Sequence, residues 1–301
     1  MTLVHHRHDG DGWIECACGQ RHWGLHGAAG LLLVDGHPVD DDGVVRRVLL
    51  QHRAHWSHHG GTWGVPGGAR ASTETALEAA LREAAEEAAI PPDAVWPSHA
   101  WVEDHGPWSY TTVVATADRP VEPHPSDPES LDIVWTPVGD VEALPLLPAF
   151  GAMWPSILDQ AHRRLVLVVD AANVVGSRPD GWWRDRKGAT TRLRDELVRL
   201  SSVPAEPLGL PAMLWWPSVV LVTEGQARGV PSVDGVSVVE APRGGDDTIV
   251  DVVAQARQAR QGDHVVAVTA DRELRARIDS AGGRSVGPST LFELTRRAVR
   301  A

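Results

Sequence analysis

Three glutamates between residues 83 and 87 have a spacing that places them on one side of a helix. Glu83, Glu86 and Glu87 are related by i, i+3 and i+4, and residues with this spacing are neighbours on a helix surface. Like charges so close together repel. A divalent cation removes that cost, because Mg²⁺ and Mn²⁺ prefer oxygen ligands and bridge carboxylates to phosphates. The spacing therefore predicts a metal site that acts on a phosphate compound, with a solvated acidic helix face as the alternative. Arg82 lies next to the cluster and can be held by Glu74.

The segment that carries these residues resembles the Nudix box, G-x5-E-x7-R-E-U-x-E-E-x-G-U, in which U is a bulky apolar residue. The matching positions are Gly68, Glu74, Arg82, Glu83, Glu86, Glu87 and Ile90. Ala84 and Ala89 depart from the pattern, and the departures concern local packing and the exit of the helix. The runs 60–68 and 129–135 also resemble Nudix segments, so the likeness covers residues 25–160.

The resemblance implies a pyrophosphohydrolase that cleaves a diphosphate linkage in a nucleoside triphosphate or a nucleoside-diphosphate-X substrate. By similarity to the family, the three glutamates hold Mg²⁺ or Mn²⁺, and a water activated by a metal or a carboxylate attacks phosphorus. Glu74 and Arg82 orient these ligands, and a backbone carbonyl near Gly67 completes the coordination. A further carboxylate from outside the box comes from Glu103, Asp104 or Glu129.

Histidines and aromatic residues flank this segment. Four histidines precede the glycine-rich turn: His52, His55, His58 and His59. They either face the substrate or belong to a polar loop that is exposed to solvent. Trp108 and Tyr110 either stack on a base or belong to the core.

A second group of metal-binding side chains lies near the N-terminus. Cys16, Cys18 and His22 offer thiolate and imidazole ligands that suit zinc, with His5, His6 or His8 as the fourth ligand. The alternative is a small hairpin with reduced cysteines, because the spacing is not that of a standard zinc finger. A disulfide is not expected between cysteines separated by one residue.

Acidic residues in the second half follow short apolar runs. Asp170 ends one run, Asp271 follows another, and Asp246 with Asp247 opens a helix-like interval after two glycines. The carboxyl ends of parallel strands meet at one edge of a sheet, where open α/β proteins place their sites. The pattern therefore predicts a second metal site, although a lone aspartate there is often a helix cap.

These segments resemble the NYN branch of PIN-like nucleases, including YacP-like proteins, in the sequences V-V-D-A-A-N at 168–173, G-D-D-T-I at 245–249 and V-T-A-D-R-E-L at 268–274. The family often has glycine where this chain has Ala171. The resemblance implies that Mg²⁺ or Mn²⁺ bound at these positions activates water against RNA phosphodiesters. Basic and aromatic residues at 182–187 suit a phosphate backbone, with a dispersed solvated surface as the alternative. The implied ligands are Asp170, Asn173, Asp246 or Asp247, and Asp271, with Asp185 and Glu196 as weaker candidates.

The elements that must position these residues differ between the halves. In the first half, strands are expected at 31–34, 44–50, 110–115 and 133–136. One helix is expected at 75–89, with Ser72 and Glu74 as its cap signal. The Nudix resemblance implies an α/β/α sandwich. In the second half, strands at 165–169, 219–223, 236–240 and 265–269 alternate with helices at 190–200, 248–259, 272–281 and 290–299, which predicts a doubly wound parallel sheet.

Length and charge support two domains. The chain has 301 residues; residues 1–160 hold 8 basic and 23 acidic residues, whereas residues 161–301 hold 20 basic and 17 acidic residues. A proline-rich stretch at 143–155, followed by a helix at about 156–163, separates them. The expected domains are 1–160, with an N-terminal extension at 1–24, and 161–301.

Two functions follow from these patterns. The first is a Nudix pyrophosphohydrolase with a nucleotide-derived substrate, in which the second domain binds or cleaves RNA. The second is an RNA-processing nuclease whose Nudix half senses a nucleotide or removes a cap. The chain has no apolar run of the length that spans a membrane, so we expect a soluble, cytoplasmic protein without a membrane partner.

Overall fold

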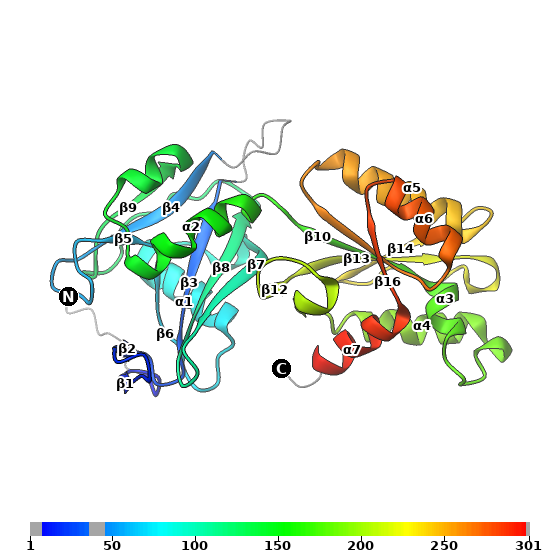
Figure 1. The fold of residues 1–301 in the computed structure, drawn as a ribbon, viewed down its shortest axis with the longest axis horizontal. Helices are drawn as coiled ribbons and strands as arrows, with labels where there is room; N and C mark the ends of the chain where they lie inside the picture. Colours follow the sequence, from blue (N-terminus) through cyan, green and yellow to red (C-terminus); the bar gives the residue numbers. More distant parts are fainter. Residues whose placement is uncertain (1–7, 36–45, 299–301) are drawn as a thin grey trace. The chain divides into compact units, whose positions relative to one another are not determined.

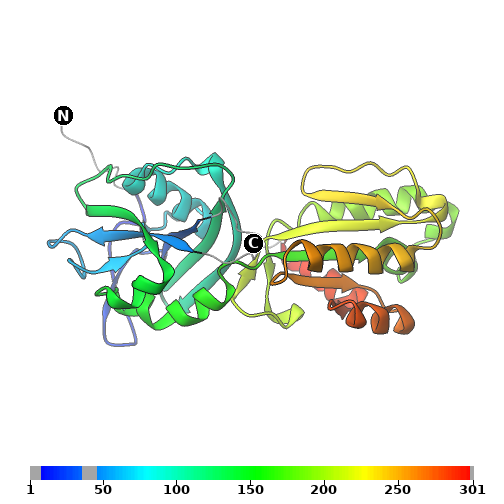
Figure 2. The same ribbon diagram turned by 90° about the horizontal axis from the view of Figure 1, so that it is seen from above.

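The apolar run Ala28–Val34 forms a strand, β3, in the computed structural model of the chain, which describes residues 8–35 and 46–298. All seven residues of β3 are buried, so both faces of this strand must be covered. On one face, Leu32 packs in a cluster with Phe150 and Trp154 of helix α2 (Pro148–Gln160). Helix α1 (Ala76–Ala88) packs on the other face, and Figure 2 shows the two helices on opposite sides of the sheet. This is the α/β/α arrangement that the Nudix resemblance implies.

The sheet of the first half is mixed. Strand β3 pairs in parallel with β8 and antiparallel with β6 and β4, while β7 extends the sheet antiparallel to β8. Strands β5 and β9 pair antiparallel with β4. Strand β7 was not predicted, and strand β4 begins later than predicted, with Val44 and Val45 outside the described residues. The strands are β4 (Arg47–Arg53), β5 (Trp63–Gly64), β6 (Gly67–Ala69), β7 (Val95–Asp104), β8 (Ser109–Ala117) and β9 (Ser130–Pro137).

Helix α1 lies where the sequence predicts it, but its N-cap is a different residue from the one predicted. Thr75 is the N-cap, and its hydroxyl accepts a hydrogen bond from the Glu78 amide while Glu78 bonds back to the Thr75 amide. This is a capping box, which requires glutamate or glutamine three residues after the cap. The prediction of Ser72 with Glu74 was wrong because those residues are only two apart; Ser72 instead hydrogen-bonds Asp9.

The proline-rich stretch is mostly helical. Helix α2 begins at Pro148, not near residue 156, and Pro155 lies inside it. Proline is favourable in the first turn of a helix because the amide that it lacks has no partner there. The interior proline costs one backbone bond, and the burial of Trp154 and Ile157 offsets that cost. Two short 3-10 helices complete this half, η1 (Pro92–Ala94) and η2 (Val138–Ala143).

A small hairpin precedes this sheet. Strands β1 (Trp13–Glu15) and β2 (Arg21–Trp23) pair antiparallel as a separate two-stranded sheet. The turn between them holds both cysteines and closes through Gly19, whose φ of 82° suits glycine.

The second half contains the predicted parallel sheet. Its five strands run in the order β14-β13-β10-β15-β16, and every pair is parallel. The sequence did not predict β16, or helix α3 (Ala171–Gly176), because both are too short to show a period. The strands are β10 (Leu165–Asp170), β13 (Pro217–Thr223), β14 (Val236–Glu240), β15 (His264–Val268) and β16 (Arg284–Val286).

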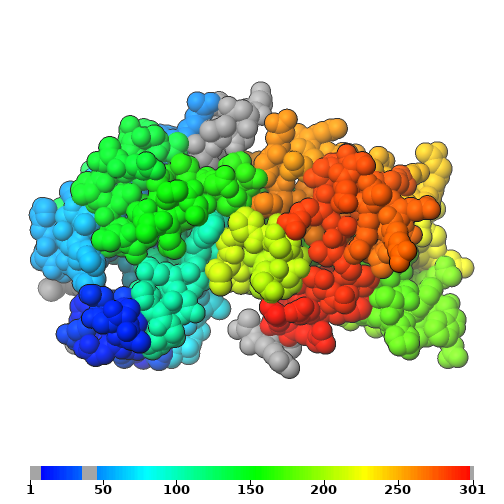
Figure 3. Space-filling model, viewed as in Figure 1, coloured from blue at the N-terminus to red at the C-terminus, as the bar shows by residue number. Residues whose placement is uncertain are grey.

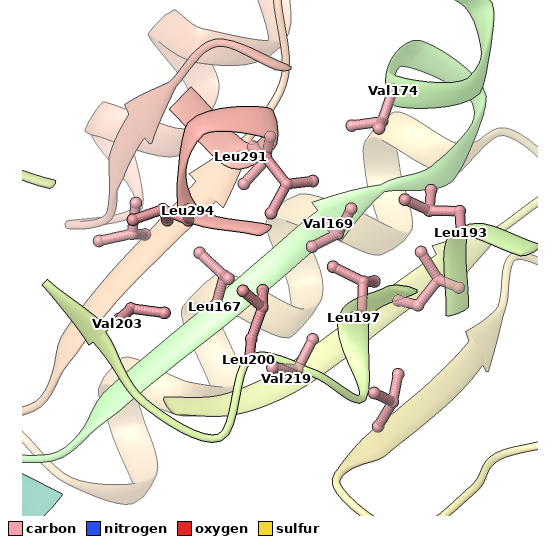
Figure 4. Close-up of a cluster of buried hydrophobic side chains, with 14 of the residues drawn as sticks. Leu167, Val169, Val174, Leu193, Leu197, Leu200, Val203, Val219, Leu291 and Leu294 are labelled. Carbon is pink, nitrogen blue, oxygen red and sulfur yellow. The ribbon is translucent and has the colours of Figure 1, made fainter. Parts of the chain in front are cut away.

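Helices cover both faces of this parallel sheet (Figure 1). Leu167 and Val169 of β10 pack with helices α4 and α7, as Figure 4 shows, whereas Val168 faces a second cluster with helices α5 and α6. This alternation is the signature of a strand buried on two sides. The helices are α4 (Arg186–Leu197), α5 (Gly245–Ala259), α6 (Arg272–Ser280) and α7 (Pro288–Ala298). The shorter elements are η3 (Trp182–Arg184), η4 (Glu206–Leu208), η5 (Gly225–Ala227), β11 (Val203–Pro204) and β12 (Leu214–Trp215).

The chain divides into two compact units, Met1–His162 and Arg163–Ala301, and each is described by itself. The sequence-based boundary was placed between residues 160 and 161. Across residues 8–35 and 46–298, no helix combines the length and the hydropathy that crossing a membrane requires.

Candidate functional site

Helix α1 carries the three glutamates in a gradient from buried to exposed. Glu87 is 4% exposed, and the side chains of Glu83 and Glu86 are 12% and 54% exposed. The amide of Gly67 donates a hydrogen bond of 2.7 Å to Glu87 Oε2. The contact seen at Gly67 is thus between its amide nitrogen and Glu87. The prediction concerned a different group, the backbone carbonyl near Gly67, as a metal ligand. The helix therefore presents its acids to strand β6 and to the solvent above it.

Arg82 connects four groups around this helix. Its Nε and Nη2 donate to the two oxygens of Glu74 at 2.7 and 3.0 Å, and Nη2 also donates to the Ala69 carbonyl at 2.9 Å. Its Nη1 donates to Glu83 at 2.8 Å and to Glu86 at 3.3 Å. The charged hydrogen bonds between Arg82 and Glu74 lower the pKa of Glu74 and raise the pKa of Arg82. Arg82 thereby fixes the directions of the Glu74 and Glu83 carboxylates.

Two glycines allow strand β6 to approach its neighbours. A Cβ atom on Gly68 would lie 2.5 Å from Glu83 Oε1, and one on Gly67 would lie 2.5 Å from the Cα of Gly30. Both distances are shorter than real side chains tolerate. A Cβ at Gly68 would therefore displace the Glu83 carboxylate, which lies directly against the backbone.

Two acids from outside the helix join Glu87. One oxygen each of Glu87, Asp127 and Glu129 lies within 4.8 Å of the other two. Of the three acids that the sequence left open, the structure therefore brings Glu129 to the helix. Glu103 contacts His105 at 2.9 Å, and exposed Asp104 accepts from the Gly106 amide. Sequence reasoning missed Asp127, which lies in the turn before β9, two residues from Glu129.

Burial and mutual repulsion act on these carboxylates together. Burial raises the pKa of Glu83 to about 7, with Arg82 opposing the shift. Burial, and then the charges of Glu83 and Asp127, raise the pKa of Glu87 well above its usual range. Arg53, at the end of β4, opposes this shift and is a basic group that the sequence analysis did not single out. A hard divalent cation fits this set of carboxylate oxygens because it neutralises charges that burial makes costly.

The nearby rings are mostly packed against the protein. His52 stacks on Trp63 with 4.5 Å between centroids, and His58 meets the edge of Trp13. Trp108 is buried, stacks on His22 and donates to the Trp23 carbonyl. These contacts assign Trp108 to the core.

The N-terminal cysteines meet a histidine from a distant segment. Cys16, Cys18, His22 and His105 each place one ligand atom within 4.8 Å of the others. His105 was not predicted to join this cluster. His8, a predicted fourth ligand, instead faces Asp11, and His5 and His6 lie outside the described residues.

In the second unit, several predicted acids lie at the carboxyl edge of the parallel sheet. Asp170 is 9% exposed and accepts from the Thr269 hydroxyl and the Asn173 amide, each at 3.0 Å. Asn173 Oδ1 accepts from the Ala270 amide. Burial raises the pKa of Asp170 and of Asp246. Strands β13, β10 and β15 are neighbours, so the residues after them share one edge.

Other acids of this unit have structural partners. Asp271 and Asp185 cap helices α6 and α4. Glu196 makes a bidentate pair with Arg178, and Asp247 is 71% exposed and pairs with Arg277. Glu224, which the sequence analysis missed, accepts from the Gly245 amide at 2.6 Å and acts electrostatically on Asp170 and Asp246. Within the described part of this unit, no three acidic or imidazole side chains come within 4.8 Å of one another.

Comparisons with known proteins bear on the first unit. Two curated relatives and one crystal structure are similar to it. A "Nucleoside triphosphate pyrophosphatase/Nudix hydrolase fusion protein" of Bifidobacterium longum is 51% identical over 149 residues, 48% of this chain and 30% of that protein. The "Putative 8-oxo-dGTP diphosphatase 3" of Mycobacterium tuberculosis is 46% identical over 154 residues, 49% of this chain and 69% of that protein. The crystal structure of RenU, a Nudix hydrolase from M. smegmatis, is 44% identical and covers 49% of this chain and 92% of that one, with a TM-score of 0.45.

The similar segment therefore spans less than a third of the Bifidobacterium protein. The family model of the NUDIX domain matches residues 25–183, which include α1, the glycines before it and both acids of the 127–129 turn. The match ends inside the second unit. Because it covers more than half of the residues, the chain belongs to the NUDIX hydrolase family.

Proposed function

We propose that this chain is a metal-dependent pyrophosphohydrolase that cleaves a diphosphate linkage in a nucleoside triphosphate or a nucleoside-diphosphate-X substrate. The observation that carries the proposal is the buried carboxylate of Glu87 beside those of Asp127 and Glu129. A buried acid among other acids is costly in a purely structural role. It is useful where a cation and phosphate groups bind.

Each residue of the site has a separate task in this proposal. Glu83, Glu86 and Glu87 would hold Mg²⁺ or Mn²⁺, with Asp127 and Glu129 as the acids from outside the helix. When bound, the cation supplies positive charge to the phosphate oxygens and activates water for attack on phosphorus. Arg82 holds the Glu83 carboxylate in place, and Glu74 holds Arg82. The Gly67 amide holds the Glu87 carboxylate.

The relatives suggest where to look for the substrate. One relative carries the name "Putative 8-oxo-dGTP diphosphatase 3", and the other is named as a fusion of a nucleoside triphosphate pyrophosphatase with a Nudix hydrolase. We therefore place nucleoside triphosphates, including those with an oxidised purine, first among the substrate classes. A screen of the purified full chain with Mg²⁺ or Mn²⁺ should compare these with dinucleotides, ADP-ribose and nucleotide sugars.

The metal site is tested by removing one charge at a time on the same helix. Glu87→Gln and Glu86→Gln should each lower turnover by about two orders of magnitude or more, because each removes a charge that the cation neutralises. Glu78→Gln is the matched control, since glutamine also completes a capping box and Glu78 lies outside the site. Near wild-type turnover of a folded Glu87→Gln protein would sink the proposal.

A second activity is proposed for the second unit, a PIN-like ribonuclease or RNA-binding module. It is supported by Asp170, Glu224 and Asp246 at one edge of the parallel sheet, where such folds place their sites. Asp170→Asn should abolish metal-dependent RNA cleavage and leave nucleotide hydrolysis unchanged. If the intact chain cleaves no RNA but binds it with salt-sensitive affinity, the unit is a binding module. Loss of nucleotide hydrolysis in folded Asp170→Asn would mean that the two sites are coupled.

A further inference from the structure

Four side chains of the types that bind zinc, from two segments distant in sequence, meet at the turn of the N-terminal hairpin. Cys16, Cys18 and His22 come from the hairpin, and His105 comes from the turn that joins β7 to β8. Their ligand atoms lie within 4.8 Å of one another, and Cys18 Sγ is 3.2 Å from His22 Nε2. A tetrahedral zinc with Zn–S of about 2.3 Å and Zn–N of about 2.0 Å holds its ligand atoms roughly 3.3–3.8 Å apart. Small side-chain movements would therefore complete such a site.

The two histidines are held by other side chains. Glu103 Oε1 lies 2.9 Å from His105 Nε2, which leaves Nδ1 as the ring nitrogen for the cluster. Zinc-binding histidines commonly have such a carboxylate behind them, because it fixes the ring and makes the other nitrogen a better ligand. The His22 ring stacks on Trp108 at 4.1 Å between centroids, and Trp108 is fixed by its bond to the Trp23 carbonyl.

The thiols lie in a turn that suits metal binding. The Cys16 amide donates to the Gln20 carbonyl, and the Gly19 amide donates to the Cys16 carbonyl, which closes the turn around both sulfurs. Zinc binds thiolate sulfur, and this one short turn supplies both sulfurs.

The hairpin itself is short and only partly buried. Strands β1 and β2 have three residues each, and Trp13 and Trp23 remain 40% and 39% exposed. An isolated two-stranded hairpin is marginally stable in water. Figure 3 shows the hairpin in blue beside the connection that carries His105. A metal shared by the two segments would fasten the hairpin to the body of the first unit.

We propose that Cys16, Cys18, His22 and His105 bind one Zn²⁺ as a structural site that is separate from the carboxylate site on α1. All four positions are then filled by protein ligands, which is the mark of a structural site and not a catalytic one. Glu103 acts as the positioning residue for His105.

The first test is metal content. The full chain, purified without a polyhistidine tag and dialysed against metal-free buffer, should retain about one zinc per chain by elemental analysis. Cys18→Ser and His105→Asn should each lose it. His26→Asn is the matched control, since His26 is exposed in the same N-terminal segment and lies outside the cluster. Retention of one zinc by a folded His105→Asn protein would overturn the ligand set.

A second measurement keeps the proposal testable if the loss variants unfold. His105→Cys replaces one zinc ligand with another, so it should restore zinc content that His105→Asn lacks. Cobalt added to the reduced, zinc-stripped chain should give the visible absorption of a tetrahedral thiolate site. Glu87→Gln should bind zinc like the wild type, because its carboxylate belongs to the other site. If the reduced wild-type chain takes up neither stoichiometric zinc nor cobalt, the cluster is not a metal site.

Discussion

The end of helix α1 offers a sharp test of how backbone conformation affects stability. Ala89 follows the helix with φ 55° and ψ 32°, the left-handed conformation, where the Nudix pattern has glycine. Its amide donates to the Ala84 carbonyl, and the amide of buried Ile90 shares that acceptor. The surrounding bonds therefore hold an L residue in a conformation that it avoids. Ala89→Gly should stabilise the first unit.

The magnitude follows from three contributions. Relief of the left-handed conformation contributes about 1–2 kcal/mol. The greater freedom of glycine in the unfolded chain removes roughly 0.4–1 kcal/mol of this gain. The half-buried Ala89 methyl removes a few tenths more, being less than the ~0.8 kcal/mol of a fully buried group. We expect a net gain of about 0.5 kcal/mol, which raises Tm by roughly 1–2 °C for a unit of this size.

Calorimetry of the full chain in the presence of a chelator measures this shift without a contribution from bound divalent cations. Ala88→Gly is the matched control, because Ala88 is the preceding residue, helical and fully buried. There glycine costs about 1 kcal/mol in helix propensity and about 0.8 kcal/mol in lost burial, so Tm should fall by roughly 3–7 °C. If Ala89→Gly lowers Tm as Ala88→Gly does, the left-handed strain is not real and the reasoning fails.

Three further predictions concern the helix, the glycine of the box and the two units. Thr75→Ala should cost about 1 kcal/mol of unfolding free energy in the same calorimetric assay, whereas Ser72→Ala should leave α1 almost unaffected because Ser72 is not its cap. Gly68→Ala should reduce nucleotide hydrolysis, measured as consumption of the nucleotide substrate, with an unchanged circular dichroism spectrum, because the added Cβ displaces a carboxylate of the site. Fragments 1–162 and 163–301 should each be soluble with the helix content of their unit, since each has its own core; precipitation of either fragment on expression would count against this.

Regular, local patterns in the sequence predicted the elements that carry the site. Residues 75–89 lack glycine and proline, so α1 was predicted nearly to the residue. The strict alternation of strands and helices predicted the parallel sheet. The errors arose where one signal was given too much weight. Proline was read as a linker although Pro148 starts a helix, and Ser72 was chosen although Thr75 has the acid at the required spacing.

Contacts between distant segments could not be predicted in the same way. His105 joins the cysteines because β7 and β8 form a hairpin whose turn lies beside the turn between β1 and β2, and β7 itself was not predicted. Asp127 joins Glu87 because the loop before β9 returns to α1, where the Ser126 amide donates to the Glu87 carbonyl. Loop paths of this kind depend on tertiary packing, which leaves no periodic signal in the sequence.

The cluster of acids around Glu87 and the aspartates at the edge of the parallel sheet differ in how much of their structure is explained without a metal. Asp170 and Asp271 each cap a helix, which is the ordinary role of an aspartate after a strand, and Asp247 is satisfied by Arg277 at the surface. Glu87 lies inside a helix and caps nothing. Burial and the charges of Glu83 and Asp127 raise the pKa of Glu87. The hydrogen bond from the Gly67 amide lowers it, but the pKa stays well above the usual range. A carboxylate in that position destabilises the fold unless a cation neutralises it. The cluster around Glu87 therefore gives a stronger reason to expect a bound cation than the aspartates of the parallel sheet.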